Sequence, residues 1–174
     1  MAKSKTPRKA YQPRRIPRDM ANKLIYSTIF RASTQAISEE QISALITPFR
    51  AQIEALRLAK TDLDGWTRLI EMNLFSFALA SRIFHSTNDE EARRQIEPSQ
   101  KVFEAAAEAL FQIGKRFRVR NKFIATGDEL HVIRESSIWL NELLAIAPEG
   151  LALTALMEAE QDVRDYWRRG EQAA

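Results

Sequence analysis

Apolar side chains recur three or four residues apart along most of this 174-residue chain. That spacing places them on one face of an α-helix, whereas a half-buried strand would alternate apolar and polar residues. Only residues 116–120, Arg-Phe-Arg-Val-Arg, alternate in this way, and they predict a short ribbon or a frayed helix end. We therefore expect an all-α protein, a single bundle of five to seven helices.

Helix-start signals divide the chain into segments. Asp19 is a candidate N-cap, and Ser38 with Gln41 has the spacing of a capping box. The segment after this box carries one apolar stripe, formed by Ile42, Ile46, Phe49, Ile53 and Leu56. Pro48 interrupts the stripe and predicts a kink or a restart capped by Thr47, because proline removes a helical hydrogen bond.

Further helices are expected over about 61–85, from the acidic cap at 88–91, from about 127, and after a turn at 147–150. In the segment that begins at 88–91, the residues after Pro98 form a heptad-like apolar seam of Phe103, Ala106, Leu110, Ile113 and Phe117.

The segment from about 64 to 85 is predicted to be the central helix. Its polar residues Asn73, Ser76 and Arg82 are scattered around the helix and do not form one polar face. A helix that is apolar on most sides is surrounded by others. On this basis we expect Phe77 to be a core residue.

The first 18 residues differ from the rest of the chain. They contain seven of the 26 Lys and Arg, none of the 23 Asp and Glu, and three of the six prolines. With only two large apolar side chains, such a segment cannot bury enough surface to offset its ordering entropy. Residues 1–18 are predicted to be an extended basic arm, and residues 19–174 the helical bundle domain.

Cations spaced along this arm suit a phosphate backbone, because each neutralised phosphate releases counterions and an aromatic ring can stack on bases. An acidic protein surface, or a purely solubilising tail, would suit the same charges. The arm residues predicted to bind nucleic acid or another partner are Lys3, Lys5, Arg8, Lys9, Tyr11, Arg14, Arg15 and Arg18.

A second basic cluster follows the predicted seam of the fourth segment. In a helix, Lys115, Arg118 and Lys122 would share one face. In an extended segment, Arg116, Arg118 and Arg120 would share one face. Either backbone therefore predicts a positive ridge. The alternative is that these residues complement the negative end of a helix dipole. The ridge consists of Lys115, Arg116, Arg118, Arg120 and Lys122.

Catalytic chemistry has little support in the composition. The chain has no cysteine, two histidines and no glycine-rich phosphate loop, so we expect no enzyme, no cofactor and no metal. The N-terminus lacks the apolar stretch of a secretory signal, and no segment is apolar enough to span a membrane. A cytoplasmic protein without membrane association is expected.

Two short stretches carry a resemblance. Residues 8–15, Arg-Lys-Ala-Tyr-Gln-Pro-Arg-Arg, resemble the K-x-Y-x-P-[RK] start of small proteins encoded by proteobacterial prophages, and residues 126–130 followed by Ile133 and Arg134 resemble a segment before a late helix of those proteins. The resemblance implies an all-helical accessory protein of phage or mobile-element origin. It carries over no catalytic residue. Roles among such proteins include nucleic-acid binding and inhibition of host defence through binding to a host protein.

These features predict a non-enzymatic binding protein that engages nucleic acid or a nucleoprotein assembly through the arm and the ridge. The alternative is a phage-type inhibitor or adaptor that binds a host protein complex, for instance a nucleic-acid-guided defence complex. In that case Trp167, with neighbouring arginines in the last helix, would be the candidate contact.

Overall fold

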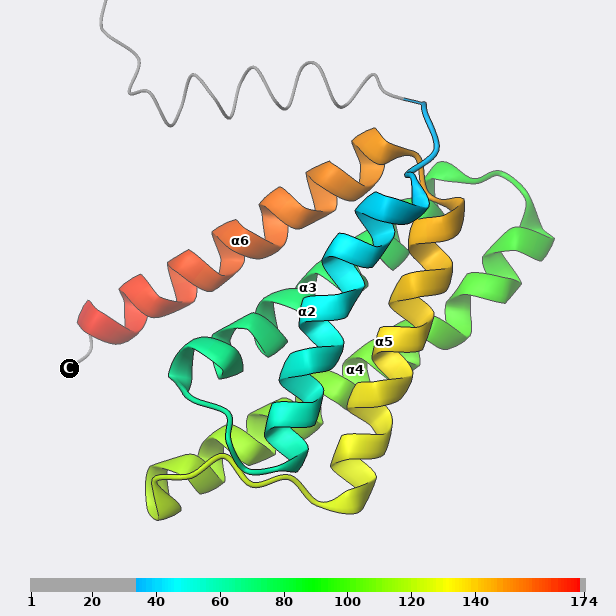
Figure 1. Ribbon diagram of the computed structural model, residues 1–174. Coiled ribbons are helices and arrows are strands. Elements are labelled where there is room, and N and C mark those ends of the chain that lie inside the picture. Colours follow the sequence, from blue (N-terminus) through cyan, green and yellow to red (C-terminus); the bar gives the residue numbers. More distant parts are fainter. Residues whose placement is uncertain (1–33, 173–174) are drawn as a thin grey trace, which may run out of the picture.

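The computed structural model describes residues 34–172 as five helices around one core (Figure 1). The all-α prediction is confirmed. Within the described residues the only β contact is an isolated bridge between Ala36 and Pro148, beside which the Glu149 N–H donates to the Gln35 carbonyl at 2.8 Å. The helices are α2 (Glu39–Arg57), α3 (Leu63–Ser86), α4 (Glu90–Arg120), α5 (Gly127–Ile146) and α6 (Glu149–Gln172).

Side-chain caps start four of these helices. Ser38 and Gln41 form the predicted capping box of α2, and Asp89 caps α4 as expected. Asp62 caps α3 by accepting from the Gly65 N–H at 2.8 Å. The box that starts α5, Thr126 with Glu129, was not foreseen. These local bonds satisfy N–H groups that no helical carbonyl can reach.

Both internal prolines lie within continuous helices. The predicted restart at Pro48 is wrong, because α2 runs through this residue. The α4 helix begins at its predicted acidic cap and also runs through Pro98. The buried residues of α2 lie on both sides of Pro48, so packing of one continuous face against the core offsets the hydrogen bond that proline removes.

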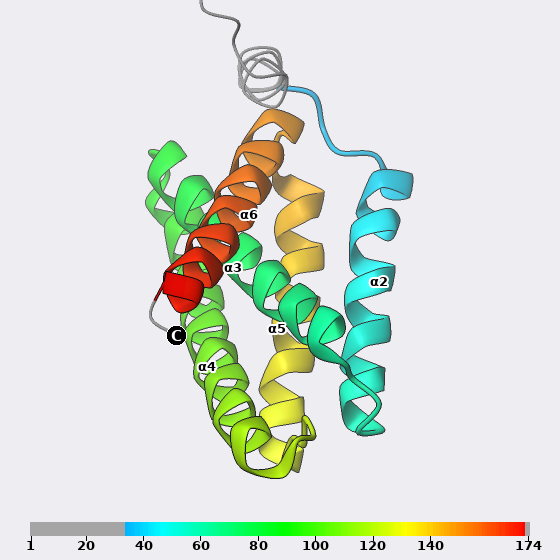
Figure 2. The same ribbon diagram turned by 90° about the vertical axis from the view of Figure 1, so that its left-hand side faces the viewer.

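The α3 helix is central, as predicted, and packs against each of the other four described helices (Figure 2). Its buried residues include Leu69, Phe75 and Leu79, none of which is exposed to solvent. The core position expected for Phe77 is wrong, since this side chain is 40% exposed. Successive helical residues point about 100° apart, so Phe75 and Phe77 face in nearly opposite directions.

The alternating residues 116–120 are helical, so the ribbon alternative is wrong. They form the last turn of α4, which ends at Asn121 in the left-handed conformation with φ of 52°. Asparagine tolerates this region better than most residues do. The chain then reverses and enters α5 at Thr126, which brings the end of α4 beside the start of α5.

Candidate nucleic-acid interface and adjoining groove

The arm cannot be placed in this fold, because Lys3, Lys5, Arg8, Lys9, Tyr11, Arg14, Arg15 and Arg18 lie outside the described residues. The same holds for the side chain of Trp167. Of the predicted binding residues, the structure therefore locates the basic cluster alone.

The basic cluster lies at the carboxyl end of α4 and in the turn that follows. Lys115 and Arg118 are one turn apart and share a face of the helix, while Lys122 comes after the helix has ended. Lys115, Arg118, Arg120 and Lys122 are all exposed. The structure thus keeps one part of the predicted helical alignment and removes Lys122 from it.

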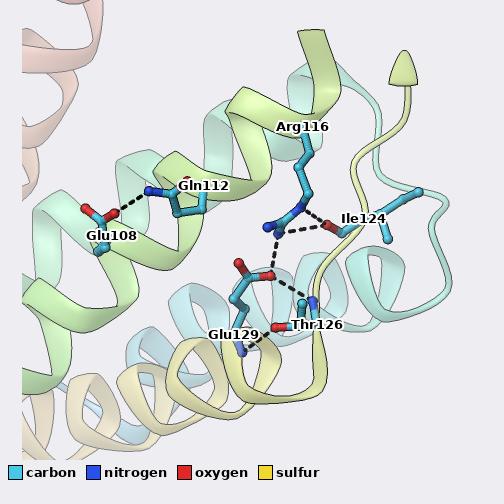
Figure 3. Close-up of polar contacts among 6 residues, drawn as sticks. All are labelled: Glu108, Gln112, Arg116, Ile124, Thr126 and Glu129. Atoms are coloured by element: carbon cyan, nitrogen blue, oxygen red, sulfur yellow. Dashed lines mark hydrogen bonds and ion pairs between the residues drawn. The ribbon is translucent and has the colours of Figure 1, made fainter. Parts of the chain in front are cut away.

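Arg116 differs from the other four cations because its guanidinium is held within the protein (Figure 3). Its Nε and Nη2 donate to the Ile124 carbonyl at 3.2 and 3.1 Å, and Nη2 also donates to Glu129 Oε2 at 2.5 Å. These bonds join the end of α4 to the connecting loop and to the first turn of α5. Arg116 therefore has a structural partner that its place in a basic run did not suggest.

Glu129 is the acceptor at this junction. Burial by itself raises the pKa of its carboxyl group, but hydrogen bonds from Arg116 and from the Thr126 N–H outweigh that effect and leave the pKa below its ordinary value. Its side chain is 15% exposed. Glu129 is thus both the N3 residue of the α5 capping box and the counterion of Arg116.

The other four cations have no carboxylate partner among the described residues, where no ion pair involves Lys115, Arg118, Arg120 or Lys122. By contrast, Arg94 and Lys101 in the first half of the same helix pair with Glu90 and Glu97 one turn away. In the part of the chain that the structure describes, ion pairs thus leave these four charges at the carboxyl end of α4 unneutralised, and the charges complement the negative end of the helix dipole there.

An apolar groove adjoins this basic end and was not foreseen from the sequence. It encloses about 650 Å³ between the first half of α3, the second half of α4 and one turn of α6. The two cations that line it, Lys115 and Arg118, belong to the basic cluster. Its apolar lining includes Leu63, Trp66, Ile70, Leu74, Leu110, Phe111, Phe117 and Val163.

Exposed apolar side chains mark the groove. Phe111 is 56% and Leu63 is 50% exposed, whereas Trp66 below them is buried and stacks on Phe123 with 4.8 Å between ring centres. Lys115 Nζ lies 4.4 Å from the centre of the Phe111 ring, within the range of a cation–π interaction. In the sequence, the feature that could have indicated this groove is Phe111, an apolar residue next to Leu110 of the predicted seam.

Comparison with known proteins gives no family for this chain: no protein-family model, no curated protein and no solved structure matches it. In the described part of the chain, no helix combines the length and the apolar character needed to cross a membrane. Nor do the described residues bring three histidine or acidic side chains together as a metal site. A proposal for the function of this chain therefore rests on its own residues and their geometry.

Proposed function

We propose that this chain is a non-catalytic binding protein that engages nucleic acid, or a nucleoprotein assembly, through its basic arm and the basic end of α4. The observation that supports the proposal is the group of four cations, Lys115, Arg118, Arg120 and Lys122, with no carboxylate partner among the described residues. Phosphate groups are suitable counterions for cations that the protein leaves unpaired.

The mode of binding follows from the placement of these cations. Arg120 and Lys122 lie at a helix end and in a turn, and neither element presents a row of side chains to the edges of bases. Contacts to the phosphate backbone position a protein without reading sequence. We therefore propose binding of low sequence specificity, as suits an accessory protein of phage or mobile-element origin.

Salt dependence of binding tests the proposal. Labelled duplex DNA and single-stranded RNA are titrated with the full chain between about 50 and 300 mM salt, and binding is followed by fluorescence anisotropy. With about six neutralised phosphates, the slope of log affinity against log salt is expected near −5 for DNA. The triple variant Arg14→Gln, Arg15→Gln, Arg18→Gln should flatten that slope by about 2 to 3 units.

A second triple variant, Arg118→Gln with Arg120→Gln and Lys122→Gln, should flatten the slope of log affinity against log salt by a similar amount. The matched control replaces three exposed bases elsewhere, Arg94, Lys101 and Arg168, by glutamine and should change the slope much less. Absence of binding at about 50 mM salt, or equal slopes for the cluster and control variants, would overturn the proposal.

A second candidate function is that of an inhibitor or adaptor that binds a host protein complex. The observation in its favour is the apolar groove, because exposed Phe111 and Leu63 on facing helices are typical of protein-binding surfaces. Binding of this kind depends on packing and falls much less with ionic strength than phosphate binding does.

A further inference from the structure

Two antiparallel helices form the long walls of the groove. Along α3 the lining residues Leu63, Trp66, Ile70 and Leu74 follow each other at three- and four-residue intervals. Along α4 the lining runs from Ala107 to Arg118 in the same way. Eleven residues of helix rise about 16 Å, so each wall is about three turns long. A groove with these walls has the length of a short third helix.

The floor of the groove depends on a glycine. A Cβ atom on Gly114 would lie 3.1 Å from Trp66 Cζ2, closer than ordinary van der Waals contact. Because Gly114 has no side chain, α4 can lie close to the Trp66 ring of α3 at this point. Phe111 on α4 and Leu63 on α3 also line the groove, and both side chains are exposed.

Charge is distributed unevenly around the opening. Lys115 and Arg118 lie along the α4 wall without an ion-pair partner among the described residues, while Asp162 lies on the α6 side. Below them Asn73 is 3% exposed; its Nδ2 donates to the Phe103 carbonyl at 3.1 Å, but its buried Oδ1 accepts no hydrogen bond. One edge of the groove is therefore suited to an anionic group, and its floor offers a free acceptor.

We propose that this groove binds an amphipathic α-helix of a partner protein. The partner helix is about three turns long, carries apolar side chains at i, i+3 or i+4, and i+7, and has acidic residues along the edge that meets Lys115 and Arg118. This gives the protein-partner candidate a defined site, and it does not require that the chain bind nucleic acid.

The test uses three synthetic helical peptides of 14 residues with the same leucine stripe. One has glutamates along one edge, one has lysines there, and one has the acidic composition in scrambled order. Amide and methyl NMR spectra of the full chain report binding. The acidic-edge peptide should shift the signals of Leu63, Ile70 and Leu74 and bind roughly tenfold more tightly than either of the others.

Charge reversal makes the test specific. Lys115→Glu with Arg118→Glu should weaken the acidic-edge peptide roughly tenfold and strengthen the lysine-edge peptide. The matched control, Arg94→Glu with Lys101→Glu, reverses two exposed charges on the same helix outside the groove and should leave both affinities unchanged. Phe111→Ser should also weaken binding, and because Phe111 is 56% exposed the variant is expected to fold.

Three results would overturn the proposal: equal binding of the acidic-edge and scrambled peptides, no exchange of preference on charge reversal, or tighter binding of sodium dodecanoate at the same signals, which would indicate a site for small amphiphiles. Failure here is distinguishable from failure of nucleic-acid binding. Phe111→Ser should not alter DNA affinity, and replacing Arg120 and Lys122 by glutamine should not alter peptide affinity.

Discussion

Arg116 near the end of α4 forms an ion pair with Glu129 in the first turn of α5, across a loop whose Ile124 carbonyl accepts from the same guanidinium (Figure 3). The pair closes the connection between two helices that pack against each other. Through this pair Arg116 joins two helices of the fold. It differs in this from the other four cations of the basic cluster, Lys115, Arg118, Arg120 and Lys122, which have no ion-pair partner among the described residues.

Arg116→Ala should destabilise the protein by about 1.5 to 3 kcal/mol at pH 7, since it removes charge-assisted hydrogen bonds to Glu129 and Ile124. The pKa of Glu129 is lower in the folded state than in the unfolded state. The stability that this shift contributes is present above the unfolded value, near 4.3, and is lost as pH falls through the lower folded pKa. The difference between wild type and variant should therefore shrink at about pH 3.

Urea unfolding at both pH values measures this effect. Arg120→Ala, which removes an exposed arginine from the same turn, is the control and should stay within about 0.5 kcal/mol of wild type. A difference for Arg116→Ala that is the same at pH 7 and pH 3 would contradict the role of the Glu129 carboxylate.

The pKa of Glu71 on α3 is shifted in the opposite direction from that of Glu129. Burial, followed by the nearby Glu160 on α6, raises the pKa of its carboxyl group above the ordinary value, and Arg164 and Arg68 offset this only in part. A raised folded pKa means that the ionised form opposes folding above that pKa, and that the penalty disappears below the unfolded value. Glu71→Gln should therefore stabilise the protein at pH 7, by less than about 1 kcal/mol because solvent screens a partly exposed group.

The thermal midpoint at pH 7 and at pH 3 checks the Glu71 prediction. The gain should be present at pH 7 and absent at pH 3. Glu104→Gln removes an exposed carboxylate on α4 and is the matched control. A loss of stability at pH 7 would show that the charge of Glu71 is needed for the contact between α3 and α6.

Phe75 and Phe77, both on α3, should differ sharply in how much stability their replacement by alanine costs. Phe75→Ala is expected to cost about 3 to 5 kcal/mol, because Phe75 is fully buried and its removal leaves a cavity. Phe77→Ala should cost less than about 1.5 kcal/mol, because Phe77 is 40% exposed and loses much less contact area. Chemical denaturation of the two variants side by side measures the difference. Equal costs would show that another surface covers Phe77.

Deletion of residues 1–18 should leave the thermal midpoint within a few degrees of the full chain, because this segment has little apolar surface to bury. Nucleic-acid affinity should fall in the same variant, since seven cations are removed. Circular dichroism and the anisotropy titration measure the two effects. A much larger fall in the midpoint would mean that the arm packs against the bundle.

Many of the helix starts and buried faces could be predicted from residues that are close together in the sequence. Ser38 with Gln41, and Asp89 before two glutamates, predicted helix starts because a cap bonds to N–H groups two or three residues away. The stripe of Ile46, Phe49 and Ile53 predicted a buried face because the helical period places these residues together. These properties depend on short separations in sequence, so the sequence by itself determined them.

The candidate site depended on contacts between distant residues. Whether Phe75 or Phe77 is covered depends on which other helices pack on α3, and the partner of Arg116 is brought near by the turn after Asn121. The groove is lined by residues such as Gly114 and Trp66, which are 48 positions apart and meet across antiparallel helices. A local pattern cannot reveal such pairings, because a residue's spacing along its own helix does not state what lies opposite. Only the tertiary structure decided which cations lack an ion-pair partner, and where an apolar groove lies, among residues 34–172.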